Sequence, residues 1–287
     1  MKKLLYILVL VCVFSCDSED ANDCFQKAGN TIQQEVVVTD FEKIFVDRNI
    51  ELILTEAPDF SIIIETGENL MNDVEAKVIG NTLQLSDSNT CNFVRDYEAT
   101  KIYVSAPNIT EIRSSTQYDI SSNGVLSYPI LRLLSENANN PDTNTIGDFR
   151  LQVNAEEILI TANNISSFYL SGQTDKLQVG FYAGTGRFEG EDLIAQEITI
   201  SHRGSNDMIV NPQQSLKGVL RGTGDLISKN HPPVVEIEQI YTGCLAQGAY
   251  YIESAGEVAI IDPLRETKPY IERAKRDNAK IKYIFET

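Results

Sequence analysis

Apolar and polar residues alternate along the first half of the chain, which is the pattern of β-strands that bury one face. The apolar positions there fall two apart, as at Ile50 and Leu52, and polar turns separate the runs. Residues 78–85 predict two short strands around a Gly-Asn turn, and residues 69–76 predict one short helix. This part of the chain is therefore expected to be rich in β-strand.

The second half of the chain repeats itself with a period of about 20 residues. Each copy is a short polar motif that ends in an apolar residue, and short alternating strands lie between the copies. The copies begin at Asn164, Gly184, Gly204 and Gly222. An earlier copy is expected at residues 114–118.

Such a period is typical of a β-solenoid, in which each coil buries its inward side chains on the next coil. An antiparallel sandwich also has short, regularly spaced strands, but the likeness between the turns favours the solenoid. The expected fold is all-β, a right-handed parallel β-helix preceded by a β-rich N-terminal part. Polar residues 136–147 are expected to form a loop that interrupts the stack.

The N-terminus has the pattern of a secretory signal, with Lys2 and Lys3 followed by an apolar run over residues 4–14. The run is too short to span a bilayer as a helix, which takes about 20 residues. Residues 13–16 resemble a bacterial lipobox, which implies cleavage after a signal peptide of residues 1–15 and lipidation of Cys16. Ordinary cleavage with a free Cys16 thiol is the alternative.

Residues 16–34 are expected to be an acidic leash between the lipid and the folded body. A charge run of this kind is usually a solvated segment, but it also resembles the tag that exports some Gram-negative lipoproteins to the outer face of the outer membrane. The expectation is an outer membrane lipoprotein, exposed on the cell surface and attached to the membrane through its N-terminal lipid.

Charge divides the chain into unlike parts. Residues 16–243 hold 15 basic and 34 acidic side chains, a net charge of −19, whereas residues 244–287 hold seven of each. A surface as acidic as the first of these repels nucleic acid and anionic lipid. We therefore expect no nucleic-acid partner, and a body held away from the membrane surface.

Five cysteines are present, at positions 12, 16, 24, 91 and 244. Once the signal and the lipidated residue are set aside, Cys24 and Cys91 are the one pair inside the acidic body. An exported protein meets an oxidising compartment, so a Cys24–Cys91 disulfide is expected, which would fasten the leash to the domain. Two free thiols are the alternative, and Cys244 has no evident partner.

Several stretches together resemble the head GIN domain, a family described as an autotransporter adhesin head and common in lipoproteins. They are residues 38–46, 50–54, 62–66 with 69–71, the Gly-Asn-Thr-Leu turn at 80–83, 222–226 and 232–237. The resemblance covers about residues 35–243. It implies a β-solenoid at the cell surface and no established activity.

Residues 245–287 resemble the opening strands and first helix of a metallo-β-lactamase-type enzyme, of the persulfide-dioxygenase branch. The H-x-H-x-D-H ligand run of such enzymes is missing, and Asp262, which matches a position of that fold, cannot hold a metal alone. Residues 244–287 are therefore expected to be a truncated α/β fragment without metal ligands, a β-hairpin with a helix over residues 266–278. The two histidines, His202 and His231, are each expected in surface loops.

Other candidate chemistry is weaker. The Gly-Thr-Gly motifs at 184–186 and 222–224 lack the lysine and helix of a phosphate loop and are expected to be coil corners. Acidic residues that could bind Ca²⁺ by type alone are Asp142, Asp148, Glu189, Glu191 and Asp192. Aromatic residues that could stack on sugars are Tyr169, Phe181 and Tyr182, with inward packing expected for at least half of them.

These observations predict no enzyme activity, no cofactor and no metal. The expected function is that of a surface-anchored adhesin that binds a polysaccharide or another cell-surface ligand. A polysaccharide lyase or hydrolase is the alternative, and it would need Arg187 or Arg203 beside a carboxylate such as Glu189 or Asp207. A purely structural envelope protein is a third possibility.

Overall fold

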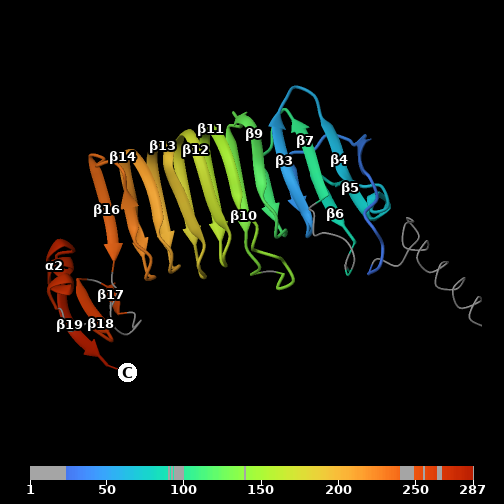
Figure 1. Cartoon of the computed structure of the whole chain (residues 1–287). Helices are drawn as coiled ribbons and strands as arrows, with labels where there is room; N and C mark the ends of the chain where they lie inside the picture. Colours follow the sequence, from blue (N-terminus) through green and yellow to red (C-terminus); the bar gives the residue numbers. More distant parts are fainter. Residues whose placement is uncertain are drawn as a thin grey trace, which may run out of the picture.

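The computed structural model describes residues 24–89, 91, 93, 100–138, 140–239, 249–254, 256–263 and 267–286. The predicted signal peptide, Cys16 and Cys244 lie outside these residues. Within them the chain is almost entirely β-strand (Figure 1), with one α-helix, α2 (Lys268–Arg276), and one 3₁₀ turn, η1 (Met71–Asp73). The all-β prediction is therefore confirmed.

The N-terminal part is a mixed arrangement of seven strands. They are β1 (Thr31–Val36), β2 (Lys43–Val46), β3 (Ile50–Glu56), β4 (Ser61–Gly67), β5 (Val74–Ile79), β6 (Thr82–Asp87) and β7 (Thr100–Ala106). β4 pairs antiparallel with β1 and β7, and β5 pairs antiparallel with β6, whereas β3 with β7 and β2 with β6 are parallel. The hairpin predicted over residues 78–85 is confirmed, and its turn places Gly80 at a φ of 63°.

The helix predicted over residues 69–76 is wrong beyond the single turn η1. Val74, Ala76 and Val78 alternate with polar residues, and this alternation lets β5 pair with β6 and pack against the core. Pairing with a neighbouring strand outweighs the local helical preference of so short a segment.

The remaining strands of the body are stacked in parallel. They are β8 (Glu111–Ser114), β9 (Ile120–Leu126), β10 (Ile130–Ser135), β11 (Phe149–Ala162), β12 (Ser167–Phe181), β13 (Arg187–His202), β14 (Met208–Leu220), β15 (Leu226–Ser228) and β16 (Val234–Gln239). Every pairing among them is parallel, which speaks against an antiparallel sandwich in this part. The predicted loop at residues 136–147 lies between β10 and β11.

The long strands β11 to β14 each belong to two faces of the sheet. The first half of β11 pairs with β9 and its second half pairs with β10. The sheet therefore has two faces. The first face consists of β9 and the first halves of β11 to β14, and the second face consists of β8, β10 and the second halves of β11 to β14. The sheet nearly closes around the core, much as a barrel does.

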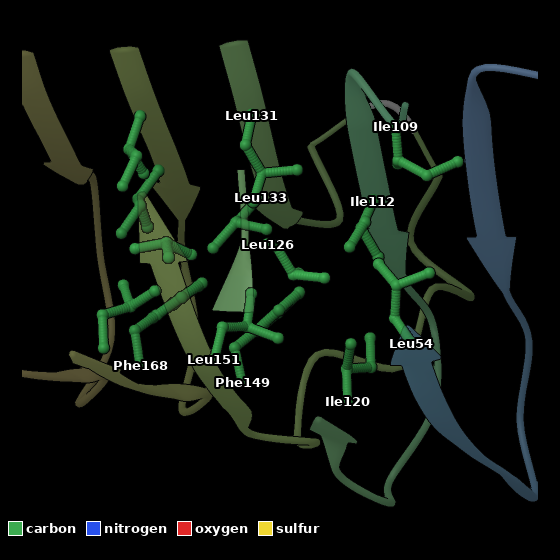
Figure 2. Close-up of a cluster of buried hydrophobic side chains, with 14 of the residues drawn as sticks. Leu54, Ile109, Ile112, Ile120, Leu126, Leu131, Leu133, Phe149, Leu151 and Phe168 are labelled. Atoms are coloured by element: carbon green, nitrogen blue, oxygen red, sulfur yellow. The ribbon is translucent and has the colours of Figure 1, made fainter. Parts of the chain in front are cut away.

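Inward side chains at matching register positions of adjacent strands form ladders, and these ladders fill the space between the two faces. Phe149, Phe168, Phe188 and Met208 occupy one ladder and are all buried. The Phe149 and Phe168 rings stack with centroids 4.8 Å apart and planes 7° apart. Figure 2 shows Phe149, Leu151 and Phe168 with Leu126, Leu131 and Leu133 in the same apolar cluster. The alignment of the repeat copies is thus confirmed from Phe168 onward, whereas the earlier copy aligns two residues later than predicted, with Ile120 opposite Phe149.

The glycine corners between coils are required by close backbone contact. A Cβ atom on Gly222 would lie 2.0 Å from the carbonyl oxygen of Gly204, and one on Gly184 would lie 2.1 Å from that of Asn164. At such distances a side chain fits only if the backbone shifts. The Gly-Thr-Gly motifs are therefore coil corners, as predicted.

The N-terminal segment joins the body earlier than the predicted boundary at residue 35. β1 begins at Thr31, Gln26 is buried and donates a hydrogen bond to the Asn69 carbonyl at 2.8 Å, and Cys24 is bonded to Cys91. The described end of the expected leash is therefore part of the fold.

The C-terminal residues form a separate small unit with its own sheet and core. β17 (Tyr250–Ser254) and β18 (Glu257–Ile261) make the predicted hairpin, and β19 (Lys280–Phe285) pairs parallel with β18. Val258, Ile260 and Tyr270 of α2 are buried in its core. The helix predicted over residues 266–278 is present but shorter. It runs from Lys268 to Arg276, with Pro269 in its first turn.

Candidate functional site

A polar groove lies where the chain turns from the first face to the second. The middles of β11, β12 and β13 form it together with the link between β9 and β10. Its volume is about 430 Å³, and its lining includes Ser127, Asn154, Glu156, Gln173, Asp175 and Gln196. We call it the corner groove. Its size falls within the range of sites that hold small ligands, roughly 300–1,000 Å³.

Side-chain amides are aligned between adjacent coils along the corner groove. Gln173 donates from Nε2 to Oδ1 of Asn154 at 2.9 Å, and Asn154 and Gln173 are register partners on β11 and β12. Both side chains are exposed. Each amide has more donors and acceptors than this bond uses, so the pair can form further hydrogen bonds with a ligand.

The turn beneath these amides is fixed by the backbone. Gly172 has a φ of 108°, and a Cβ atom there would lie 2.0 Å from the Val153 carbonyl oxygen. Thr174 is buried and donates to the Lys176 carbonyl at 3.1 Å. The coil can therefore bend at Gly172 only because this residue has no side chain, and the exposed amides sit on a fixed corner.

A second hollow, of about 300 Å³, lies on the first face beside the corner groove. Its lining includes Tyr169, Ser171, Glu189, Glu191 and Asp192. The pairing of β12 with β13 shifts register between Tyr169 and Gly172, so that β13 carries one extra residue there. Such bulges re-aim side chains, and here the bulge coincides with the acidic wall of the hollow. We call it the bulge hollow.

Ion pairs and hydrogen bonds hold the walls of the bulge hollow. Lys229 Nζ lies 2.8 Å from Glu191, whose carbonyl accepts a hydrogen bond from Asn211 at 3.0 Å. The Arg150 guanidinium lies 4.1 Å from the centre of the Tyr169 ring and pairs with Asp119 at 2.6 Å and Asp148 at 3.2 Å. Its hydrogen bond to Asp119 raises the pKa of Arg150. The nearby cations are thus already neutralised by carboxylates.

Of the two arginines considered for a lyase, Arg187 meets the requirement of that alternative, since it lies beside Glu189. Arg187 Nε lies 2.5 Å from Glu189, an ion-pair distance whose alignment is not that of a hydrogen bond. Asp207 accepts a hydrogen bond from the Asp225 amide at 3.0 Å, and Arg203 is exposed in a turn. Arg187 and Glu189 lie two residues apart on β13, whereas the bond between Asp225 and Asp207 joins neighbouring coils.

His202 is not a surface residue, so its predicted position is wrong. It lies in the inward ladder between Phe181 and Leu220, is 1% exposed and contacts the Phe181 ring edge-on. Its Nε2 lies 2.8 Å from the Asn206 carbonyl, and its Nδ1 accepts a hydrogen bond from the Gly204 amide. Burial lowers the pKa of His202. The neutral imidazole with its hydrogen on Nε2 satisfies both bonds, and His231 is exposed as predicted.

The other candidates divide between core and surface. Phe181 is buried, Tyr169 is half-buried, and Tyr182 is 55% exposed. Among the described residues no group of three or more His, Cys, Asp or Glu side chains is placed to hold a metal ion. The candidate Ca²⁺ ligands Asp148 and Glu191 are paired with Arg150 and Lys229 instead. In the same part of the chain, α2 is far too short and polar to be a membrane span.

Sequence reasoning missed the corner groove. Asn154 and Gln173 fall at equivalent positions of two coils, and this repetition was the available signal. This repetition becomes visible only when β11 is aligned with β12, because each residue alone looks like any exposed polar residue of a strand.

Comparison with known proteins adds a family and a fold. Residues 40–232 match the family model described as "Putative auto-transporter adhesin, head GIN domain". No curated protein matches the chain. The family match stops short of the C-terminal unit, so the resemblance of residues 245–287 to a metallo-β-lactamase-type enzyme stays a prediction.

Three solved structures share the fold at low sequence identity. A "putative adhesin" from Bacteroides fragilis is 16% identical with a TM-score of 0.65, over 91% of this chain and 99% of that one. A "putative adhesin" from Parabacteroides merdae, also 16% identical, has a TM-score of 0.53 over 74% and 95% of the two chains. A "putative lipid binding protein" from Parabacteroides distasonis is 16% identical with a TM-score of 0.51, over 74% and 94%.

Proposed function

We propose a surface-binding role for this chain, which belongs to the head GIN domain family, whose model matches residues 40–232. In this proposal the protein is a non-enzymatic, lipid-anchored adhesin module that binds a polysaccharide or another cell-surface ligand. The observation that carries it is the pair of polar hollows on one side of the stacked strands, built by side chains from successive coils. A binding role also agrees with the description of the family and of two structures with the same fold.

The stack suits the task because its outer surface is independent of its core. Inward positions are fixed by the ladders, whereas outward positions are free to vary in chemistry from coil to coil. An extended, repetitive surface is what solenoid proteins use for binding. In the proposal the parallel coils wind as a right-handed β-helix.

The membrane attachment in this proposal rests on the lipobox of residues 13–16. A lipid-anchored Cys16 would hold the acidic body outside the outer membrane, where a binding surface can reach polymers and other cells. Labelled palmitate should enter the wild-type protein in its native host, and Cys16→Ser should abolish the label. Digestion of the protein by protease added to intact cells tests the surface location.

Retention on ligands tests the function itself. The purified full-length protein in detergent would be passed over immobilised polysaccharides and intact bacterial cells, and the wash fractions analysed for released sugar fragments. Retention without fragments is the expected result. Released fragments would move the protein to the lyase or hydrolase class, and the absence of retention on every polysaccharide and cell type would overturn the proposed role.

A further inference from the structure

The corner groove and the bulge hollow are connected by the outward side chains of one strand. Tyr169, Ser171 and Gln173 are two residues apart on β12, and none of them is buried. Tyr169 and Ser171 line the hollow, and Gln173 lines the groove. At about 3.3 Å per residue the path along the strand is at most about 13 Å, because the chain bends at Gly172; this is enough for more than one sugar ring.

The two ends of the strip offer complementary contacts to a carbohydrate. At one end the Tyr169 ring is held by Arg150, with the guanidinium 4.1 Å from the ring centre, and supplies an apolar surface at low entropic cost. At the other end the aligned amides of Asn154 and Gln173 supply hydrogen-bond donors and acceptors. Gln196, from the next coil, also lines this end.

The charge of the strip selects among carbohydrates. Glu156 and Asp175 line the corner groove, and Glu189, Glu191 and Asp192 line the bulge hollow, whereas no lysine or arginine is among the described residues that line either one. The adjacent Arg150 and Lys229 are paired with carboxylates. Carboxylates accept strong hydrogen bonds from hydroxyl groups and repel sulfate, phosphate and uronate groups.

We infer that this strip, from Tyr169 to the Asn154–Gln173 amide pair, binds a neutral, hydroxyl-rich stretch of polysaccharide. The inference rests on the proposed binding function and specifies its site and ligand class. One sugar ring packs on Tyr169 in the bulge hollow, and a neighbouring ring along the chain donates and accepts hydrogen bonds at the amides and carboxylates of the corner groove.

The test compares wild-type protein with variants of the strip by affinity electrophoresis, with the full-length protein in detergent. The gels contain neutral polymers (dextran, galactomannan, xylan) or anionic ones (alginate, heparin). Tyr169→Ala and Gln173→Ala are the test variants. Gln178→Ala is the matched control, because Gln178 is an exposed amide on the same strand but on the second face, where it donates to Glu157 at 3.2 Å. Circular dichroism checks that every variant is folded.

Wild-type protein and Gln178→Ala are expected to bind a neutral polymer equally. Tyr169→Ala and Gln173→Ala should each weaken that binding by about tenfold, the change that corresponds to one lost contact of this kind. Equal binding by all four proteins would overturn the assigned site and leave the binding function standing. Preference for alginate or heparin would overturn the ligand class. Failure of wild type on all polymers would overturn the inference, and retention or loss on intact cells then decides the binding function separately.

Discussion

The stacked phenylalanines of the inward ladder give the sharpest test of what stabilises the fold. Phe168 is 0% exposed, stacks on Phe149 at 4.8 Å and meets Phe181 with ring centroids 5.7 Å apart. It also lies in register with Phe188 on the next coil. Its removal would leave a cavity that touches three coils at once.

The expected losses follow from what each substitution removes. Phe168→Ala removes the ring and leaves a cavity, which costs about 3–5 kcal/mol in protein cores. Phe168→Leu keeps most of the apolar volume but loses the stacked pair, worth about 0.5–1.5 kcal/mol beyond its buried area. The two variants therefore separate the cost of the cavity from the cost of the ring contact.

Urea unfolding followed by far-ultraviolet circular dichroism measures both, since the chain has no tryptophan to report by fluorescence. Gln178→Ala, an exposed change on the same strand, should stay within about 0.5 kcal/mol of wild type. If Phe168→Ala unfolds within about 1 kcal/mol of wild type, the ladder is not the main apolar core of the stack, and the packing argument fails.

Three further perturbations test other parts of the fold. Burial lowers the pKa of His202 below its ordinary value of 6.5, so the unfolded chain binds a proton on this residue more readily than the folded chain does. The stability that the neutral, buried His202 provides is therefore complete above pH 6.5 and is lost as the pH falls below that value. His202→Leu, which copies Leu220 of the next coil, should flatten that fall in urea midpoints between about pH 7.5 and 5.5, and an unchanged slope would contradict the assignment. The Cys24–Cys91 bond spans 67 residues, and its loss should lower the free energy of unfolding by up to about 4 kcal/mol. An unchanged urea midpoint for the Cys24→Ser, Cys91→Ser protein would contradict this stabilising role of the disulfide. Gly222→Ala, with a Cβ atom 2.0 Å from the Gly204 carbonyl, should cost about 1–3 kcal/mol by overpacking. A Cβ atom added at Gly80 would meet no atom within 4 Å outside its chain neighbours, so Gly80→Ala should show only the backbone cost of its φ of 63°, about 1–2 kcal/mol. A loss for Gly222→Ala that is smaller than the loss for Gly80→Ala would contradict the crowding argument.

The sequence carried enough information to predict the strands, the period and the corners. Alternation placed β3 and β4, and the spacing of the turns predicted the shared register of Phe168, Phe188 and Met208. Both signals are local, since they arise from the twofold period of a strand and from glycines that corners require.

What failed depended on neighbours in space. The helix expected at residues 69–76 gave way to the pairing of β5 with β6. His202 looked like a loop residue because it is polar, yet its place in the ladder behind Phe181 put it inside, where two backbone groups satisfy its nitrogens. Neither outcome is visible without the register of the adjacent strand.

The candidate site belongs to this second class, and the reason is physical. Inward ladders must conserve apolar volume from coil to coil because each coil packs on the next. Outward positions bear no such constraint, so the pairs that face each other between coils differ in chemistry. Two amides meet at Asn154 and Gln173, whereas a tyrosine meets a carboxylate at Tyr169 and Glu189. The bulge adds one residue to β13 on this surface, and beyond it the core ladder continues with Leu177 opposite Ile198. A binding surface can therefore change by substitution or bulge on a few coils while the stack that supports it stays the same, which explains how 16% identity can accompany a shared fold.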